Sequence, residues 1–460
     1  MKRGISIKRA FAALLAAVML ASLFAACNVN VNTTDAATTA AATTAAATTA
    51  AAAPTESDAE PVVSVQFWGH VNEAWNLSHK ATIEKFNKGQ SAVEVVGTFF
   101  PYDDFEAKIQ TSLMSGGAGA DVYEIWGGWG LDFVASNALS QVPDDLINEL
   151  KEDCYEPVMG AFEGADGKFY GVPVEFNNEY GGMLVNKVKF DELGLDYPET
   201  WDDIIDVARQ TSDSSGEVFN MRGLDFTTND TLTTTFLSMI LSQGGQYWVD
   251  GKFKLTTTEA NTALKTLVDY VVVDGLTNTD SAVALGDIES AHFLGRDEAM
   301  MVPRGPWVIS LLEEEYDKEY GVDFDYVKFP FFSSTRAFPA ETGWSMCVPK
   351  STQVADAAWT YVDFFLDKEN LLQHNINCAQ IPPRKSVATD PAFVEQLTYM
   401  KPLVDILDYG KFIGPFNTDV LKFDLRDVFI SLCSNDGTYA SVSAALEALE
   451  TQLNTELKLN

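Results

Sequence analysis

Large flat side chains gather where two expected strands end. The segment "PVVSVQFWGH" places Trp68 and His70 at the end of one strand, and "ADVYEIWGGWG" places Trp126 and Trp129 at the end of another. In open parallel sheets, ligands bind outside the carboxyl ends of the strands. Sugars present apolar ring faces edged by hydroxyl groups, so aromatic planes beside polar groups suit them. These four side chains are therefore candidate ligand contacts, with an ordinary core position as the alternative.

Polar candidates lie in later segments. Glu175, Asn177 and Asn178 directly follow an expected chain crossing, and Arg304 lies close to Trp307. The further candidates are Asp225, Asn229, Glu341 and Asp424. Their amide, carboxylate and guanidinium groups could bind hydroxyl groups. The alternatives are solvation at the surface and, for Arg304, a salt bridge. His70 has no second histidine beside it in the sequence, so we expect neither a metal site nor a cofactor.

The elements that position these residues alternate between strand and helix. Residues 61–69, 92–100 and 120–126 have the pattern of strands, and the intervening residues 76–89 and 102–117 have the pattern of helices. This alternation predicts an α/β fold with a parallel sheet covered by helices. The 400 residues from Pro61 to Asn460 are too many for one ordinary core, so we expect two lobes.

The N-terminus has the layout of an export signal. Basic residues open the chain, and an uncharged run of 17 residues ends just before Cys27. This run is at the short limit for a membrane-spanning helix, which is the alternative. Residues 23–27, "LFAAC", resemble the bacterial lipobox, although Phe24 stands where that pattern prefers leucine. We therefore expect a signal peptide at residues 1–26 and lipidation of Cys27, which anchors the protein to a membrane.

The next segment has the composition of a stalk. Between Cys27 and Glu60, a pair of threonines recurs every five residues at 33, 38, 43 and 48 among alanines. Threonine pairs are weak helix formers, and no apolar face is available to bury. Residues 27–60 are thus expected to form a flexible tether.

Charge excludes one class of partner. Without residues 1–26, four of the 31 basic residues are lost, and the remaining 27 face 66 acidic residues, a formal charge of −39. Such a surface repels phosphate backbones, so we expect no nucleic acid partner. Four further cysteines, Cys154, Cys347, Cys378 and Cys433, have no CxxC spacing and indicate neither zinc nor a disulfide framework.

Several segments together resemble a known family. Residues 164–210 contain Gly-Lys-Phe-Tyr-Gly-Val-Pro from Gly167, Asn186-Lys187, a Gly-Leu-Asp from Gly194, and Pro-Glu-Thr-Trp-Asp from Pro198. "FLGRDEAMMVPRGPW", "ETGWSMCVPKST" and "IPPRKS" follow in order. This series resembles the family 1 extracellular solute-binding proteins of ABC transporters, whose best known members bind maltose. Val185 replaces the tyrosine that this family has before Asn-Lys.

The resemblance implies a fold and a site. It implies two α/β lobes of the type II periplasmic-binding fold, joined by a hinge of several strands near residues 172, 337 and 383. Lobe I would comprise residues 61–172 and 337–383, and lobe II residues 173–336 and 384–460. Trp307 in Gly-Pro-Trp would stack on a sugar ring, and Trp344 would face the cleft. The implied protein is a monomeric, extracellular lipoprotein that delivers a carbohydrate, in our interpretation an oligosaccharide, to the permease subunits of an ABC transporter.

Other classes of protein fit less well. A secreted glycosidase would use two carboxylates, and 66 acidic residues leave room for such a pair, but no G-x-S-x-G, P-loop or HExxH motif occurs. An adhesin would show repeats or β-sandwich spacing in the body of the chain. A carrier of anions would need basic residues around its cleft. A binding protein for polyols or other solutes stays open as an alternative, and we expect no enzymatic activity.

Overall fold

The computed structural model describes residues 61–116, 119–216, 218–284 and 288–457. The expected signal peptide, Cys27 and the stalk lie outside these residues. Among the described residues, no helix combines the length and the apolar composition that a membrane crossing requires.

The first sheet contains the elements expected at the start of the chain. Its strand order is β2-β1-β3-β14-β4. The strands are β1 (Val63–His70), β2 (Val93–Phe100), β3 (Val122–Ile125), β4 (Val172–Pro173) and β14 (Ser345–Cys347). β1 pairs in parallel with both β2 and β3, which confirms the predicted parallel arrangement. β14 runs antiparallel to β3 and β4, so the sheet is mixed.

Helices cover both faces of this sheet because its strands alternate apolar side chains between them. Phe67 of β1 contacts the rings of His79 and Tyr361, whereas the neighbouring Trp68 contacts Phe100 and Tyr123. The helices of this part are α2 (Glu73–Gly89), α3 (Tyr102–Met114), α4 (Gly127–Ala135), α5 (Asp144–Asp153), η1 (Glu156–Phe162), α13 (Ala355–Leu366) and α14 (Lys368–Asn377). α2 ends at Gly89, as the sequence predicts.

The second sheet has the order β12-β6-β11-β8-β7. Its strands are β6 (Gly182–Val185), β7 (Asp213–Ser215), β8 (Val218–Leu224), β11 (Ala299–Pro303) and β12 (Asp325–Lys328). The larger helices around it are α7 (Trp201–Thr211), α8 (Asn229–Ser242), α9 (Thr258–Val272), α12 (Ile309–Tyr316), α18 (Thr418–Ser434) and α19 (Val442–Glu456). Thr200 caps α7 in a capping box with Asp203, which confirms the predicted N-cap.

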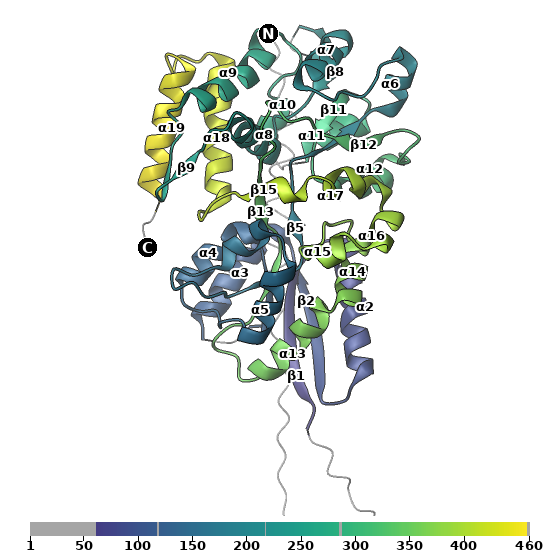
Figure 1. Cartoon of the computed structure of the whole chain (residues 1–460), viewed down its shortest axis with the longest axis vertical. Coiled ribbons are helices and arrows are strands. Elements are labelled where there is room, and N and C mark those ends of the chain that lie inside the picture. The colour runs from purple at the N-terminus through teal and green to yellow at the C-terminus, as the bar shows by residue number, and fades with distance from the viewer. Residues whose placement is uncertain (1–60, 117–118, 217, 285–287, 458–460) are drawn as a thin grey trace, which may run out of the picture. The chain divides into compact units, whose positions relative to one another are not determined.

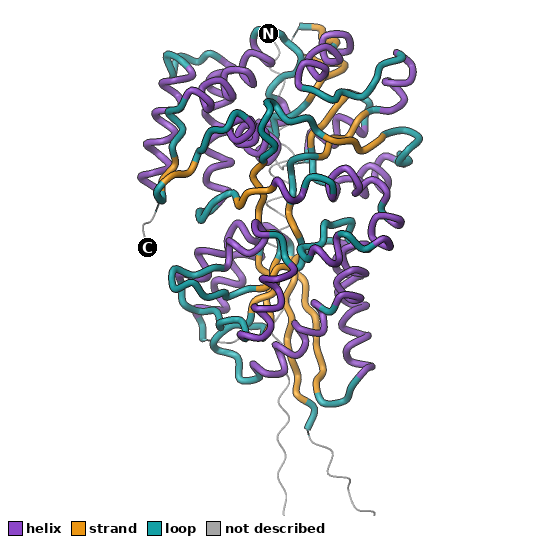
Figure 2. The backbone as a smooth tube through the Cα atoms, in the orientation of Figure 1, coloured by secondary structure: helices purple, strands orange, loops and turns teal. Residues whose placement is uncertain are grey.

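A small third sheet lies between the other two (Figure 1). It has the order β15-β13-β5, formed by β5 (Phe176–Asn177), β13 (Phe338–Thr342) and β15 (Gly410–Phe412). β5 follows β4 of the first sheet after two residues, and β13 leads into β14. The orange strands of Figure 2 show these links between the two main sheets. The chain therefore passes between the sheets through short paired strands.

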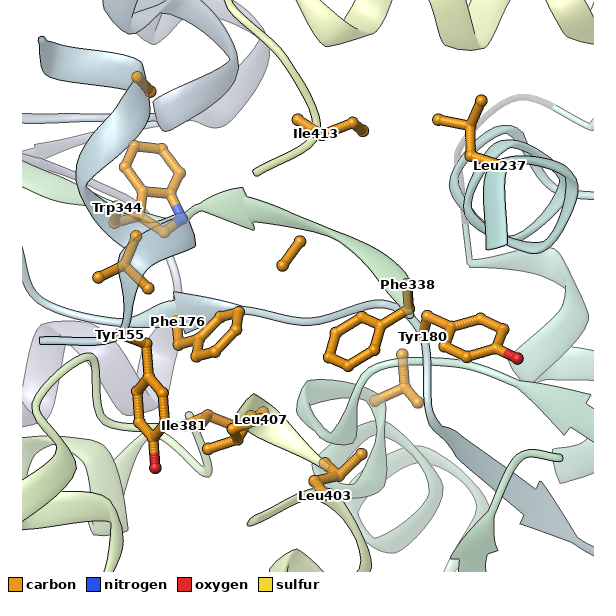
Figure 3. Packing of buried hydrophobic residues seen from close by; sticks show 14 of the residues in the cluster. Tyr155, Phe176, Tyr180, Leu237, Phe338, Trp344, Ile381, Leu403, Leu407 and Ile413 are labelled. Carbon is orange, nitrogen blue, oxygen red and sulfur yellow. The ribbon is translucent and has the colours of Figure 1, made fainter. Parts of the chain in front are cut away.

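The third sheet is held in apolar packing. Phe176 and Tyr155 pack together on one side, and the ring of Tyr180 stacks on that of Phe338 on the other (Figure 3). The backbone N–H of Phe176 donates to the carbonyl of Ile381, so a third passage of the chain runs beside the strands. Because these side chains are buried, the connection is part of the core rather than a loose linker.

The remaining elements are short. They are α6 (Lys187–Leu193), β9 (Trp248–Val249), β10 (Lys252–Phe253), α10 (Asp280–Val283), α11 (Glu289–Gly295), η2 (Pro306–Val308), α15 (Lys385–Ala388), α16 (Pro391–Gln396), η3 (Thr398–Met400), α17 (Lys401–Val404) and η4 (Leu407–Tyr409). Cys154, Cys347 and Cys378 are buried free thiols, and Cys433 is a half-buried one.

Candidate functional site

Trp344 is the centre of an aromatic group. It lies between β13 and β14, at the end of the passage from the third sheet to the first, and its side chain is labelled in Figure 3. The imidazole of His70 stacks flat on its indole, with ring centroids 4.0 Å apart and an angle of 4° between the planes. The rings of Trp126, Trp129 and Tyr102 lie 5.7, 5.8 and 6.1 Å away.

Strand ends position this group. His70 is the last residue of β1, and Trp126 directly follows β3 as the N-cap of α4, so Trp129 is presented one turn later. Tyr102 begins α3 just after β2. The structure thus brings together four residues that the sequence predicts for the site, namely His70, Trp126, Trp129 and Trp344, at the carboxyl ends of the parallel strands. Tyr102, which is 44% exposed, is an addition.

A buried lysine joins this aromatic group to several carboxylates. The ammonium of Lys422, on α18, lies 2.9 Å from Asp230, 3.1 Å from Glu341 and 3.9 Å from Asp419. It also lies 5.8 Å from the centre of the Trp126 ring. Burial alone would lower the pKa of Lys422, but the three carboxylates raise it well above its ordinary value. The lysine is therefore charged.

The carboxylate of Glu341 connects this lysine to the third sheet. The side-chain amide of Asn177 donates to Glu341 Oε2 over 2.7 Å, across the antiparallel pair that β5 and β13 form. On the other side, the indole N–H of Trp129 donates to Asp419 over 3.4 Å. Asn177 and Glu341, both predicted from the sequence, therefore belong to one connected network with the aromatic group.

Trp307 stands at the far end of this network. Its indole N–H donates to Glu179 Oε1 over 2.6 Å, and the backbone N–H of Gly305 donates to Oε2 over 3.0 Å. The guanidinium of Arg304 lies 4.7 Å from the Trp307 ring centre, and it is 3.5 Å from Asp230 and 3.9 Å from Glu179. Asp230 thus links Arg304 to Lys422, and Trp307 is connected to Trp126 through charged side chains.

Burial and neighbouring charges change the pKa values of two carboxyl groups in this region. Burial raises the pKa of Glu179, and Arg304 opposes this shift while Asp230 adds to it. Burial also raises the pKa of Glu175 to about 8, although the backbone N–H of Trp344, which donates to Glu175 Oε1 over 3.0 Å, opposes the shift. Glu175 is therefore largely neutral at pH 7, and it supports the Trp344 backbone from the segment between β4 and β5.

Two predicted residues lie apart from this network. Trp68 lines a groove of about 630 Å³ beside α3, together with Phe100, Asp104, Ala107, Lys108, Thr111, Ser112 and Ser115. Asp225 is fully buried and accepts hydrogen bonds from Ser281 and Thr227, and burial raises its pKa. The ring of Trp68 packs on Phe100 and Tyr123, and the hydrogen bonds of Asp225 join it to Ser281 and Thr227, so both side chains lie outside the aromatic group and the Lys422 network. We therefore do not include them in the site.

Sequence reasoning missed several members of the network. Glu179 lies two residues beyond Asn177, and the run "EFNNEY" could have indicated it. Lys422, Asp230 and Asp419 gave no such signal, because a lysine in an acidic helix resembles a surface residue until its partners are known. Within the described residues, no group of three or more His, Cys, Asp or Glu side chains is placed to hold a metal ion.

Comparisons with known proteins address the fold. The arabinooligosaccharide-binding protein of Halalkalibacterium halodurans is 26% identical over 233 residues, which are 47% of each chain, so the match spans about half of that relative. The cyclic α-maltosyl-1,6-maltose-binding protein of Arthrobacter globiformis has a TM-score of 0.70 at 21% identity, over 86% of this chain and 99% of its own. A solute-binding protein of Agrobacterium radiobacter in complex with ribitol has a TM-score of 0.67 at 14% identity, over 85% and 98% of the two chains.

These structural neighbours confirm the predicted fold, two α/β lobes of the type II periplasmic-binding class. Residues 74–371 match the family model of the bacterial extracellular solute-binding proteins. The matched range includes every residue of the aromatic group except His70, and it includes Arg304, Trp307 and Glu341. The chain belongs to the bacterial extracellular solute-binding proteins.

Proposed function

We propose that this protein binds an uncharged carbohydrate, an oligosaccharide, beside the aromatic group and the Lys422 network. One observation carries the proposal: the partly exposed rings of Trp126 and Trp307 stand at the two ends of a continuous series of charged groups. Indole faces stack on the apolar faces of sugar rings, and carboxylates accept hydrogen bonds from hydroxyl groups. The arabinooligosaccharide-binding and maltosyl-maltose-binding relatives support the same class of ligand.

The charges of the network favour a neutral ligand. The carboxylates of Glu179, Asp230, Glu341 and Asp419 outnumber the two cations, Arg304 and Lys422. This excess of negative charge would repel an acidic sugar, whereas the hydroxyl groups of a neutral sugar can donate hydrogen bonds to the carboxylates. These carboxylates already contact cations or indole N–H groups, which does not suit the two carboxyl groups that a glycosidase uses to cleave a glycosidic bond. We therefore propose a binding protein rather than a glycosidase.

We further propose that the two lobes close over the ligand. Residues 61–172 and 337–383 form lobe I, and residues 173–336 and 384–460 form lobe II, with the third sheet as the hinge. Arg384 pairs with Asp153 and Glu149 of α5 in the first lobe, which favours a last boundary a few residues later. A ligand that contacts both lobes binds the closed state better, and only such a difference in affinity can drive closure. The loaded protein would then deliver its sugar to the permease of an ABC transporter.

The first test is a binding titration followed by tryptophan fluorescence. Purified protein is titrated with maltotriose, arabinotriose and ribitol, and the sugar is recovered to check that it is intact. Trp307→Ala is expected to weaken binding by about 30-fold or more, because buried aromatic anchors typically contribute at least about 2 kcal/mol to binding. Trp359→Ala, on α13 and away from the network, is the matched control and should bind like the wild type.

Other outcomes would change the proposal. If only ribitol gives saturable binding, the proposed ligand is a polyol and not an oligosaccharide. Cleaved products would revive the glycosidase. Equal binding by Trp307→Ala and wild type would remove Trp307 from the site.

We also propose that the mature protein is a monomer held at the outer face of the cell membrane by a lipid on Cys27. The lipobox-like sequence before Cys27 and the stalk after it support this, and a tether keeps the protein close to its permease. Cys27→Ala is expected to move the protein from the membrane fraction to the medium, measured by immunoblotting of both fractions. Cys433→Ala removes a free thiol of the folded body and should leave the protein on the membrane. Membrane retention of Cys27→Ala would contradict the anchor.

A further inference from the structure

His70 is held between an indole and a carboxylate. One face of its ring stacks on Trp344, with centroids 4.0 Å apart. Its Nδ1 lies 2.9 Å from Glu124 Oε2, and its backbone N–H donates to the same oxygen over 3.2 Å. His70 is only 7% exposed. The imidazole therefore cannot rotate away from Trp344 without breaking its contact with Glu124.

Glu124 orients two histidines at once. It is fully buried on β3, and its second oxygen, Oε1, lies 2.9 Å from Nε2 of His79. Burial by itself would raise the pKa of Glu124, but His79 and His70 hold it well below its ordinary value. The group is thus an ionised carboxylate, which only accepts hydrogen bonds. Both facing ring nitrogens must carry hydrogen, and this fixes the orientation of each imidazole.

Regular elements surround this pair. The ring of His79, on α2, packs on Phe365 and on His374 of α14, with centroids 5.3 and 4.9 Å apart. The Nδ1 atom of His374 lies 3.0 Å from the Ser78 hydroxyl, and burial together with His79 holds the pKa of His374 well below its ordinary value. Helices and strands hold side chains more accurately than loops. The support behind Trp344 is therefore rigid.

Trp344 itself needs such support. It lies in the two-residue passage between β13 and β14, where the chain leaves the third sheet. Glu175 accepts the backbone N–H of Trp344. Trp344 is 7% exposed, and Trp75 and Phe105 approach its indole at 6.3 and 6.4 Å at tilted or edge angles, whereas His70 is stacked flat on it. Without the stacked ring of His70, only tilted and edge contacts would set the plane of the indole. Any freedom that the indole gained would have to be lost again on binding, which weakens affinity.

We propose that Glu124 and His70 are positioning residues that fix the plane of the Trp344 ring before the ligand arrives. In this role His70 acts through Trp344, whereas the sequence suggested a direct contact with the ligand. The effect on affinity rests on the proposed function. The effect on the Trp344 ring does not, since it exists in the unliganded protein.

The test observes this ring directly. The protein is labelled with 5-fluorotryptophan, and its unliganded ¹⁹F NMR spectrum is recorded, with Trp344→Phe identifying the Trp344 resonance. His70→Gln keeps a donor for Glu124 but loses the flat ring, so the Trp344 resonance is expected to shift and broaden. His70→Phe keeps a flat ring but loses the contact with Glu124, so its line is expected to be narrower than that of His70→Gln and broader than that of the wild type. The resonances of Trp201 and Trp359, outside this group, should stay in place in both variants.

Glu124→Gln is the second variant. It retains a side chain of the same shape but loses the charge that holds both imidazoles, so the Trp344 resonance should again broaden. If this buried variant does not fold, the comparison of His70→Gln with His70→Phe decides alone. An unchanged Trp344 resonance in His70→Gln would overturn the proposal. Equal changes in all tryptophan resonances would also overturn it, because they would show a general effect on the fold.

Binding provides the functional readout. With maltotriose and arabinotriose as probes, His70→Gln is expected to bind about threefold to tenfold more weakly than the wild type, and the affinity of His70→Phe is expected to lie between the two. Equal binding by His70→Gln and the wild type would contradict the effect on affinity. If neither sugar binds to the wild type, the proposed function fails, and the NMR comparison still decides whether His70 positions Trp344.

Discussion

At pH 8, the Glu175→Gln variant is expected to be more stable than the wild-type protein by about 3–5 kcal/mol, whereas at pH 5 the two should differ by about 1 kcal/mol or less. Glu175 lies between β4 and β5, and it is 2% exposed. Glutamine has the shape of the protonated glutamate and does not ionise. The variant therefore removes the titration and keeps the packing.

The sign follows from the direction of the pKa shift. Burial is the largest cause, and it raises the pKa of Glu175 from 4.5 to about 8; the Trp344 N–H opposes it, and the nearby carboxylates of Glu124, Glu179 and Glu341 add to it. Between these two values the folded state binds a proton that the unfolded state has released. The stabilisation is thus complete below about pH 4.5 and is lost as the pH rises towards 8. Glutamine abolishes this loss.

Urea unfolding at pH 5, 6.5 and 8 measures the effect as a difference between variant and wild type at each pH. Other buried carboxyl groups of the protein titrate in both proteins, so their contributions cancel in this difference. Glu152→Gln, at an exposed position of α5, is the matched control and should follow the wild type at every pH. If the free energy of unfolding of Glu175→Gln depends on pH in the same way as that of the wild type, Glu175 is ionised in the folded protein.

The elements around Glu175 were predictable from the sequence, whereas the burial of Glu175 itself was not. The strands β1, β2 and β3 and the helix α2 were predictable because hydrophobic periodicity and the terminal glycine are local signals. The position of Trp126 and Trp129 near the carboxyl end of a strand was predictable because both follow that strand in the sequence. The burial of Glu175, and hence its pKa, depends on Trp344, which lies 169 residues away in the sequence. A contact between residues so far apart in the sequence leaves no signal in a local sequence pattern.

Trp68 shows a second limit. It is two residues before the end of β1, and a strand rises about 3.3 Å per residue, so Trp68 lies roughly 7 Å short of the edge that His70 reaches. Its ring packs on Phe100 and Tyr123 instead of on Trp344. A sequence shows which residues approach a strand end, but the position at which the strand stops requires its neighbours to be known.

The charged network was the least predictable part of the site. Lys422 lies about 80 residues beyond Glu341 and about 190 beyond Asp230, and it meets both only after α18 packs beside α8, which itself packs on β13. Asp419 and Arg426, three residues before it and four after, share its helix face in the sequence, and such a charged face of an amphipathic helix is typically solvated. Burial by tertiary packing overrides that tendency.

Arg304→Met is expected to lower the free energy of unfolding by about 3–5 kcal/mol, because removing one partner of a buried charge pair leaves the other charge uncompensated. Arg304 is fully buried and lies close to Glu179, Asp230 and the hydroxyl of Thr228. Methionine replaces the volume of the side chain without its charge. Asp230 would keep the ammonium of Lys422 as a partner, whereas Glu179 would keep the neutral N–H groups of Gly305 and Trp307.

The loss should increase with pH. Burial already raises the pKa of Glu179, and Arg304 is the largest influence that opposes the rise. Without Arg304 the pKa of Glu179 would move further up, so its proton would be held in the folded state and released in the unfolded state over a wider range. Stability is lost as pH rises through such a window. Arg304→Met is therefore expected to be more destabilising at pH 8 than at pH 5, measured by urea unfolding at both values.

Arg426→Met is the matched control. Arg426 pairs with Asp427 over 2.7 Å on α18, where the Arg426 side chain is 24% exposed and the Asp427 side chain 69%, and pairs that water reaches contribute about 0–1 kcal/mol. A loss of the same small size in Arg304→Met would mean that Glu179 and Asp230 do not depend on the guanidinium. The series of charges between Trp126 and Trp307 would then consist of independent pairs, and Trp307 would have to be positioned by Glu179 alone. A large loss that grows with pH instead requires one coupled network, in which the indole of Trp307 and the ammonium of Lys422 are held by shared carboxylates.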